Sequence, residues 1–131
     1  MTVRLETSKA LDGRDHWSLT VGRVYEVLGI ACDDYRLLDD TGEPVVFDRS
    51  CFSIVDPTEP SNWVSEIDDG ARYACPPGWD EPGFFEDWHD GVPKVRESFW
   101  KQLEEWHPAT AAAPHDRDRR PPFRPYLPGG C

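Results

Sequence analysis

The sequence has no long hydrophobic run, and no stretch approaches the roughly 20 apolar residues that a helix needs to cross a bilayer. Residues 1–10 lack the basic and apolar regions of a secretory signal, so we expect a cytoplasmic protein with no membrane partner. Only 38% of the 131 residues are hydrophobic. This fraction is low for a chain that folds from end to end and predicts that part of it is disordered.

Closely spaced cysteines are missing as well. The four cysteines form no C-x-x-C pair, so their spacing indicates neither a zinc site nor a dithiol redox site. In a reducing cytosol we expect free thiols. A Cys32–Cys51 disulfide across the N-terminal strands is the alternative.

Positive charge is scarce. The chain holds 25 acidic residues against 14 Lys and Arg, a formal charge of −11. Residues 1–107 carry 23 acids and 10 bases, hence −13, whereas residues 108–131 carry +2. Such an acidic body repels phosphates and attracts basic proteins, so we expect a basic protein partner and no nucleic acid.

Residues 1–56 have the pattern of short strands separated by turns. Val3 and Leu5 alternate with charged residues, and later apolar runs are interrupted at Cys32–Asp34 and Asp40–Pro44 by turn-forming residues. The pattern predicts a first strand near residues 3–5, further strands at 24–30, 35–39, 45–47 and 53–56, and one tight helical turn at 48–52.

The spacing of hydrophobic residues and glycines in this region resembles that of small bacterial SH3-like β-barrels. The residues that carry the resemblance are Leu19, Gly22, Tyr25, Val27, Leu28, Tyr35, Asp40, Gly42, Phe52 and Val55. It implies a diverging turn, a three-stranded meander, a 3₁₀ turn and a closing strand. Some proteins of this kind are immunity proteins to toxins. Asp34-Tyr35-Arg36 stands where peptide-binding SH3 domains have their tryptophan pair, so the resemblance does not extend to proline-rich ligands.

The rest of the chain is expected to cover the barrel and then become disordered. Residues 57–107 should form a hairpin through Asp68-Asp69-Gly70, a Pro/Gly segment with buried aromatic rings, and an amphipathic helix at 92–107 that ends before Pro108. The composition of residues 108–131 predicts a disordered tail rich in Pro, Arg and Ala. In this tail, Arg119, Pro122 and Pro125 have the spacing of SH3 ligands, and its arginines are alternatively suited to contact the acidic body. The predicted fold is mainly β with a C-terminal helix, an α+β chain that is monomeric when free.

We therefore expect an acidic protein-interaction module without enzymatic activity and without a cofactor. Its candidate form is an immunity protein that binds and blocks a basic toxin or nuclease. Acids supply attraction and aromatic rings supply affinity in such interfaces. The predicted binding residues are Trp17, Asp33, Asp34, Tyr35, Asp39, Asp40, Trp79, Asp80, Glu81, Glu86 and Asp87.

The alternative is a metal-dependent enzyme. Carboxylates beside an imidazole can bind a divalent cation or transfer protons. The candidate ligands are Glu86, Asp87, His89 and Asp90. The other interpretation of this cluster is a solvated loop in which Asp90 interacts with the dipole of the following helix.

Overall fold

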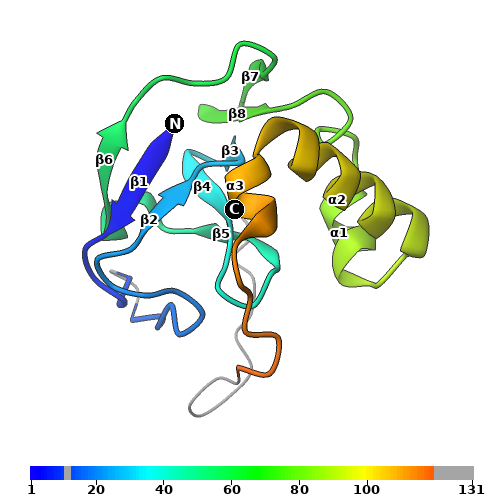
Figure 1. Ribbon diagram of the computed structural model, residues 1–131. Coiled ribbons are helices and arrows are strands. Elements are labelled where there is room, and N and C mark those ends of the chain that lie inside the picture. The colour runs from blue at the N-terminus through cyan, green and yellow to red at the C-terminus, as the bar shows by residue number, and fades with distance from the viewer. Residues whose placement is uncertain (11–12, 120–131) are drawn as a thin grey trace.

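The computed structural model describes residues 1–10 and 13–119. It confirms the predicted α+β class, with two antiparallel sheets and a few helices (Figure 1). The first sheet has the strand order β2-β1-β6, built from β1 (Thr2–Leu5), β2 (Val24–Glu26) and β6 (Phe52–Asp56). The second has the order β5-β4-β3-β8-β7, built from β3 (Gly29–Ala31), β4 (Asp34–Leu38), β5 (Pro44–Phe47), β7 (Val64–Asp68) and β8 (Ala71–Cys75).

Two tight turns form where the sequence predicts them. Cys32 and Asp33 join β3 to β4 with φ values of 51° and 66°, and Asp69 and Gly70 join β7 to β8 with φ values of 51° and 79°. Two-residue hairpins need positive φ at both central positions because this matches the twist of the flanking strands. The predicted helical turn is also present, as η1 (Arg49–Cys51).

The segment predicted as one strand at 24–30 is two strands. β2 pairs with β1, whereas β3 pairs with β4 and β8. Between them, Val27 and Leu28 are both fully buried, but they contact different hydrophobic clusters. A regular strand alternates between one buried and one exposed face, so the two consecutive buried residues mark the point where the chain passes from one sheet to the other.

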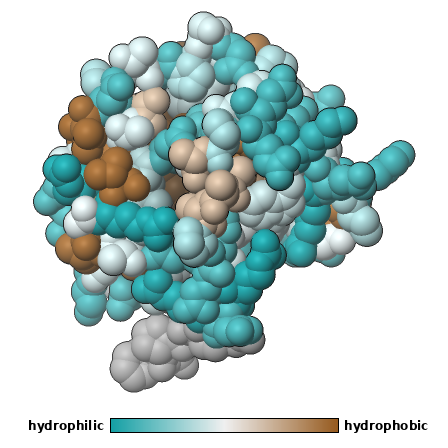
Figure 2. All heavy atoms as spheres, in the orientation of Figure 1, coloured by the Kyte–Doolittle hydropathy of each residue, from teal (hydrophilic) through white to brown (hydrophobic). Residues whose placement is uncertain are grey.

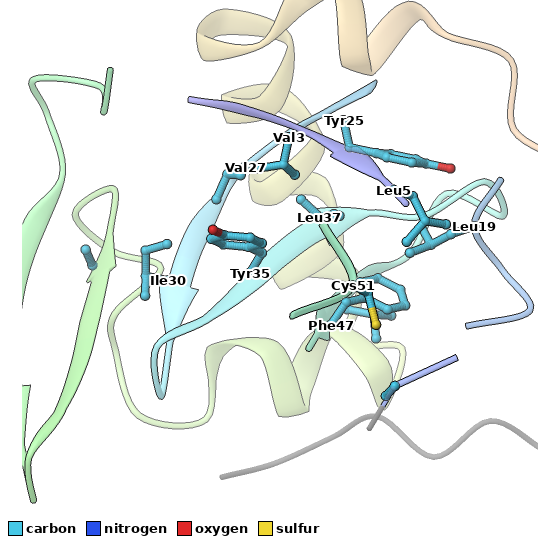
Figure 3. Close-up of a cluster of buried hydrophobic side chains, with 13 residues drawn as sticks. Val3, Leu5, Leu19, Tyr25, Val27, Ile30, Tyr35, Leu37, Phe47 and Cys51 are labelled. Carbon is cyan, nitrogen blue, oxygen red and sulfur yellow. The ribbon is translucent and has the colours of Figure 1, made fainter. Parts of the chain in front are cut away.

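One cluster, here called the strand core, fills the space between the two sheets. Its side chains point toward one another from β1, β2, β3, β4 and β5 (Figure 3). His16, from the loop after β1, packs edge-on against Phe47 with ring centroids 5.0 Å apart. The members are mainly aliphatic: Val3, Leu5, Ala10, Leu19, Tyr25, Val27, Ile30, Tyr35, Leu37, Val45, Phe47, Cys51 and Ala74.

The second cluster, the aromatic cluster, lies between the five-stranded sheet and the helices α1 (Phe84–His89) and α2 (Pro93–Trp106), which lie side by side (Figure 1). Trp79 is at its centre, with its ring centroid 4.9 Å from that of Phe99 and 5.5 Å from that of Trp106. The predicted burial of the Pro/Gly segment is thus confirmed for Trp79. The buried members are Leu28, Leu38, Trp79, Trp88, Phe99 and Leu103.

The expectation that no regular structure follows Pro108 is wrong for α3 (Pro108–Ala112). Proline is accepted in the first turn of a helix, where its missing N–H is not needed, so Pro108 begins a new helix after ending α2. Thr110 donates a hydrogen bond of 2.6 Å to Glu26, and Arg119 forms an ion pair of 2.8 Å with Asp40. The predicted contact of a tail arginine with the acidic body is therefore present, whereas Pro122 and Pro125 lie outside the described residues.

Two further findings concern the cysteines and the surface. Cys51 and Cys75 take part in no disulfide, so the Cys32–Cys51 bond does not form. Cys32 is itself disulfide-bonded, so the expectation of reduced thiols is wrong at this position. Hydrophilic side chains cover most of the face in Figure 2, and hydrophobic ones form small separate groups. Over residues 1–10 and 13–119, no helix combines the length and apolarity needed to cross a membrane.

Candidate functional site

A groove of about 360 Å³ lies between the five-stranded sheet, the β7–β8 hairpin and the segment that leads into α1. We call it the Arg36 groove, because the Arg36 side chain from β4 reaches it beside Gly29 and Cys75. Aromatic rings line it: Tyr73, Trp79, Phe84 and Phe85. Carboxylates border it from both sides: Glu66 on β7, and Asp80, Glu81 and Glu86 near α1.

Local sequence features position the walls. A Cβ at Gly29 would lie 3.0 Å from the Ala74 carbonyl oxygen and 3.1 Å from the Cys75 Cβ, so glycine is what lets β3 approach β8 this closely. On the helical side, Gly83 has a φ of 83° and turns the chain into α1. The Trp79 indole N–H donates a hydrogen bond of 2.8 Å to Gln102 on α2, which fixes this wall to the helix.

Arg36 brings a positive charge to the groove. The Arg36 guanidinium carbon lies 3.7 Å from the centroid of the Phe85 ring, a cation–π distance. Part of the Arg36 side chain borders the groove, and protein atoms surround the rest of it. This partial desolvation lowers the pKa of Arg36 to about 10. It remains a cation at neutral pH.

Cys75 does not have the properties of a nucleophile. Burial, together with the negative charge of Asp80, raises the pKa of its thiol to about 11. The thiolate is the reactive form of cysteine, and at neutral pH this thiol is protonated. The arrangement of an inert thiol, aromatic walls and fixed charges is suited to binding.

The groove brings together four of the predicted binding residues, Trp79, Asp80, Glu81 and Glu86. Sequence reasoning missed Arg36, Glu66 and Tyr73. Arg36 stands between two residues of the strand core in β4, so the alternation predicts that its side chain lies on the opposite face of the strand. That face is covered by Phe85, which the local pattern of β4 does not reveal.

Three predicted binding residues are buried elsewhere. Tyr35 belongs to the strand core. Asp39 accepts hydrogen bonds from the backbone and hydroxyl of Thr41 and caps the β4–β5 turn, and burial raises its pKa. Asp40 is 6% exposed and accepts hydrogen bonds from the Tyr25 and Thr20 hydroxyls. These side chains stabilise the fold, so the predicted exposed patch at Asp39-Asp40 is wrong.

The other predicted residues do not line the Arg36 groove. Asp33 and Asp34 are half-buried and accept backbone hydrogen bonds of 3.0 Å from Arg72 and Arg49, and burial raises the pKa of Asp34. Trp17 lines a separate hollow of about 310 Å³, whose other lining residues include Trp88, Arg96, Arg117 and Arg119. Asp87 is exposed on α1.

The predicted metal cluster does not assemble. His89 donates a hydrogen bond of 2.9 Å from Nε2 to the Pro44 carbonyl and so points at the sheet. Glu86, Asp87 and Asp90 are exposed. Within the described ranges, no group of three or more His, Cys, Asp and Glu side chains converges as metal ligands would. The geometry on which the alternative function depends is therefore not formed by these residues.

Comparison of the chain with protein-family models, with curated proteins and with solved structures finds no match. The similarity to SH3-like barrels stays a prediction from the sequence. The interpretation of the site depends on the groove itself.

Proposed function

We propose that the protein is an acidic protein-interaction module that binds a basic segment of a partner protein in the Arg36 groove. The observation that carries this proposal is the presence of four carboxylates on two sides of a groove with aromatic walls. Lys and Arg side chains present an apolar stem and a cationic head. Aromatic walls would pack against the stems while Glu66 and the acids near α1 meet the heads.

The shape of the hairpin supports the same function. All five residues of β7 are exposed, and β7 is an edge strand of its sheet. Edge strands with this exposure offer unpaired backbone groups, and acidic residues on them discourage pairing with identical copies. The acidic edge strand β7 would therefore attract a basic chain and repel the β7 strand of a second copy of this protein. The formal charge of −11 would accelerate association with such a partner.

The form of this function that we favour is inhibition of a basic toxin or nuclease, in the manner of an immunity protein. A cationic enzyme that acts on nucleic acid has a positively charged surface, and an acidic protein that covers it blocks access of the substrate. We expect the free protein to be monomeric and to act without a cofactor, a membrane or a nucleic-acid ligand.

A direct test uses an array of acetylated and amidated nonapeptides that each contain at least four Lys or Arg residues. Binding is measured by fluorescence anisotropy at low and high salt. We expect some peptides to bind the wild type and to lose affinity with rising salt. The variant Glu66→Gln/Glu81→Gln/Glu86→Gln should bind them on the order of tenfold more weakly.

The matched control is Glu97→Gln/Glu104→Gln/Glu105→Gln, which removes the same charge from exposed positions of α2. This variant should keep most of the affinity, because only long-range attraction is reduced. Equal loss in both triple variants would show that binding follows net charge and not the groove. Failure of every basic peptide to bind would contradict the proposed function.

A further inference from the structure

Arg36 is half-buried in the fold, yet none of the described acidic side chains pairs with it. Arg72 makes two bonds of 2.6 Å to the Glu59 carboxylate, and Arg23 and Arg119 both pair with Asp40. Within residues 1–10 and 13–119, no hydrogen bond or ion pair joins the Arg36 guanidinium to an acceptor. Its guanidinium contacts the face of the Phe85 ring.

Arg36 is half-buried and borders the groove, so its guanidinium is accessible to a ligand bound there. The guanidinium offers five N–H donors in a planar fork that matches the two oxygens of a carboxylate. Four carboxylates border the same groove, yet none of them is bonded to Arg36. The Arg36 guanidinium is therefore available to bind the carboxylate of a ligand in the groove.

The four carboxylates that border the groove come from two separate walls. Glu66 comes from the hairpin, whereas Asp80, Glu81 and Glu86 come from the segment at the other wall. Both Glu66 and Asp80 act electrostatically on Cys75, as does Arg36. Acidic residues on two walls and the Arg36 cation therefore line one groove, all near the same thiol.

This arrangement refines the proposed function, on which it rests. We propose that the segment bound by the Arg36 groove carries an acidic side chain, Asp or Glu, with Lys or Arg on both sides of it. The carboxylate would take both hydrogen bonds of the Arg36 fork, and the flanking cations would meet the two acidic walls. A chain-terminal carboxylate has cations on one side alone and would leave one wall unpaired.

Three acetylated peptides test the proposal. The first is Lys-Lys-Ala-Glu-Ala-Lys-Lys amide, the second has Gln in place of Glu, and the third is the Gln peptide with a free C-terminal carboxylate. The Glu peptide is one unit less positive than the Gln amide, so attraction to an acidic protein without the Arg36 contact would favour Gln. We expect the reverse, with the Glu peptide bound about tenfold more tightly than either of the others.

The role of Arg36 is tested in Arg36→Met and Arg36→Lys. In Arg36→Met the preference for the Glu peptide should vanish while the melting temperature changes little, because Arg36 is half-buried and no ion pair is lost. Arg36→Lys keeps the charge without the fork and should retain a smaller preference. Arg4→Met, which removes an exposed arginine on β1, is the control and should keep the full preference.

The outcomes separate the two proposals. Binding of all three peptides with the Gln amide tightest would overturn the carboxylate contact and leave the basic-segment function intact. Tightest binding of the chain-terminal carboxylate would overturn the choice of an internal acid. Absence of binding by all three peptides and by the wider basic array would contradict the proposed function as well.

Discussion

The strand core and the aromatic cluster lie on opposite faces of shared strands, but they are built from different side chains. In β4, Leu37 belongs to the strand core and Leu38 to the aromatic cluster. Aliphatic side chains from regular strands fill the strand core, whereas large rings from an irregular segment and two helices fill the cluster. The groove opens beside the aromatic cluster, where Phe84 and Phe85 remain partly exposed.

The difference shows that the strand core and the aromatic cluster have separate roles in this protein. The strand core sets the geometry of the sheets, and side chains such as Val27 and Leu37 are fully buried in it. The aromatic cluster attaches the helices and at the same time supplies the walls of the binding site. Substitutions should therefore separate into those that unfold the protein and those that also alter binding.

The largest loss of stability is expected from Phe47→Ala in the strand core. Phe47 is 1% exposed and packs against His16, and removal of a fully buried ring leaves a cavity. We expect the free energy of unfolding to fall by about 4 kcal/mol. Urea unfolding followed by circular dichroism measures it, and a loss below about 1.5 kcal/mol would show that the region is less tightly packed than described.

A slightly smaller loss is expected from Leu103→Ala in the aromatic cluster. Leu103 is fully buried on α2, and its removal should lower the free energy of unfolding by about 3 kcal/mol. Because Leu28 and Leu38 join this cluster to the strands, tryptophan fluorescence and circular dichroism should report the same transition. Two separate transitions would mean that the helices unfold independently of the sheets.

The third prediction concerns a carboxylate at the edge of the strand core. Asp40 accepts hydrogen bonds from Tyr25 and Thr20 and pairs with Arg23 and Arg119. Asp40→Asn keeps the shape but removes the charge, so both guanidinium groups lose their anion. We expect a loss of about 2 kcal/mol, measured by chemical denaturation. Asp87→Asn, at an exposed position, is the control with the same chemical change.

The smallest effect is expected from Glu26→Gln, which weakens the link between β2 and the C-terminal helices. Glu26 lies 2.5 Å from His107 Nδ1, and this hydrogen bond lowers the pKa of Glu26 below its usual value. We expect a loss of about 1 kcal/mol at neutral pH.

This effect has a defined dependence on pH. Since the folded pKa of Glu26 is depressed, its contribution is present above the unfolded pKa of about 4.3 and is lost as pH falls through the lower, folded value. Unfolding curves of the wild type and Glu26→Gln should therefore differ at pH 7 and converge in acid. A difference that grows below pH 4 would contradict this assignment.

Local features of the sequence predict the strands and turns well, because the signals lie in neighbouring residues. Asp69-Gly70 adopts positive φ for reasons contained in those two residues. Pro93 and Pro108 bound α2 by their own geometry. The hydrophobic spacing of α2 likewise identifies the face that contains Phe99 and Leu103.

The candidate site is less predictable, because it depends on contacts between distant residues. Asp40 resembles an exposed turn residue, yet donors 15, 17, 20 and 79 positions away bury it. Arg36 alternates with core residues as a solvent-facing charge would, and only the docking of α1 against that face reveals its role. Charge and aromatic content predicted the acidic wall at Asp80–Glu86, but not the cation opposite it.

Because the two faces of the five-stranded sheet are covered by different parts of the chain, they can be buried at different times during synthesis. The strand core draws on residues 3–51 and Ala74, whereas the aromatic cluster needs Phe99 and Leu103 to cover Leu28 and Leu38. At roughly 5–20 residues per second on the ribosome, the helix-facing side of the young sheet stays uncovered for several seconds. We therefore expect chaperones that recognise apolar surface to bind the nascent protein until α2 emerges and covers these residues.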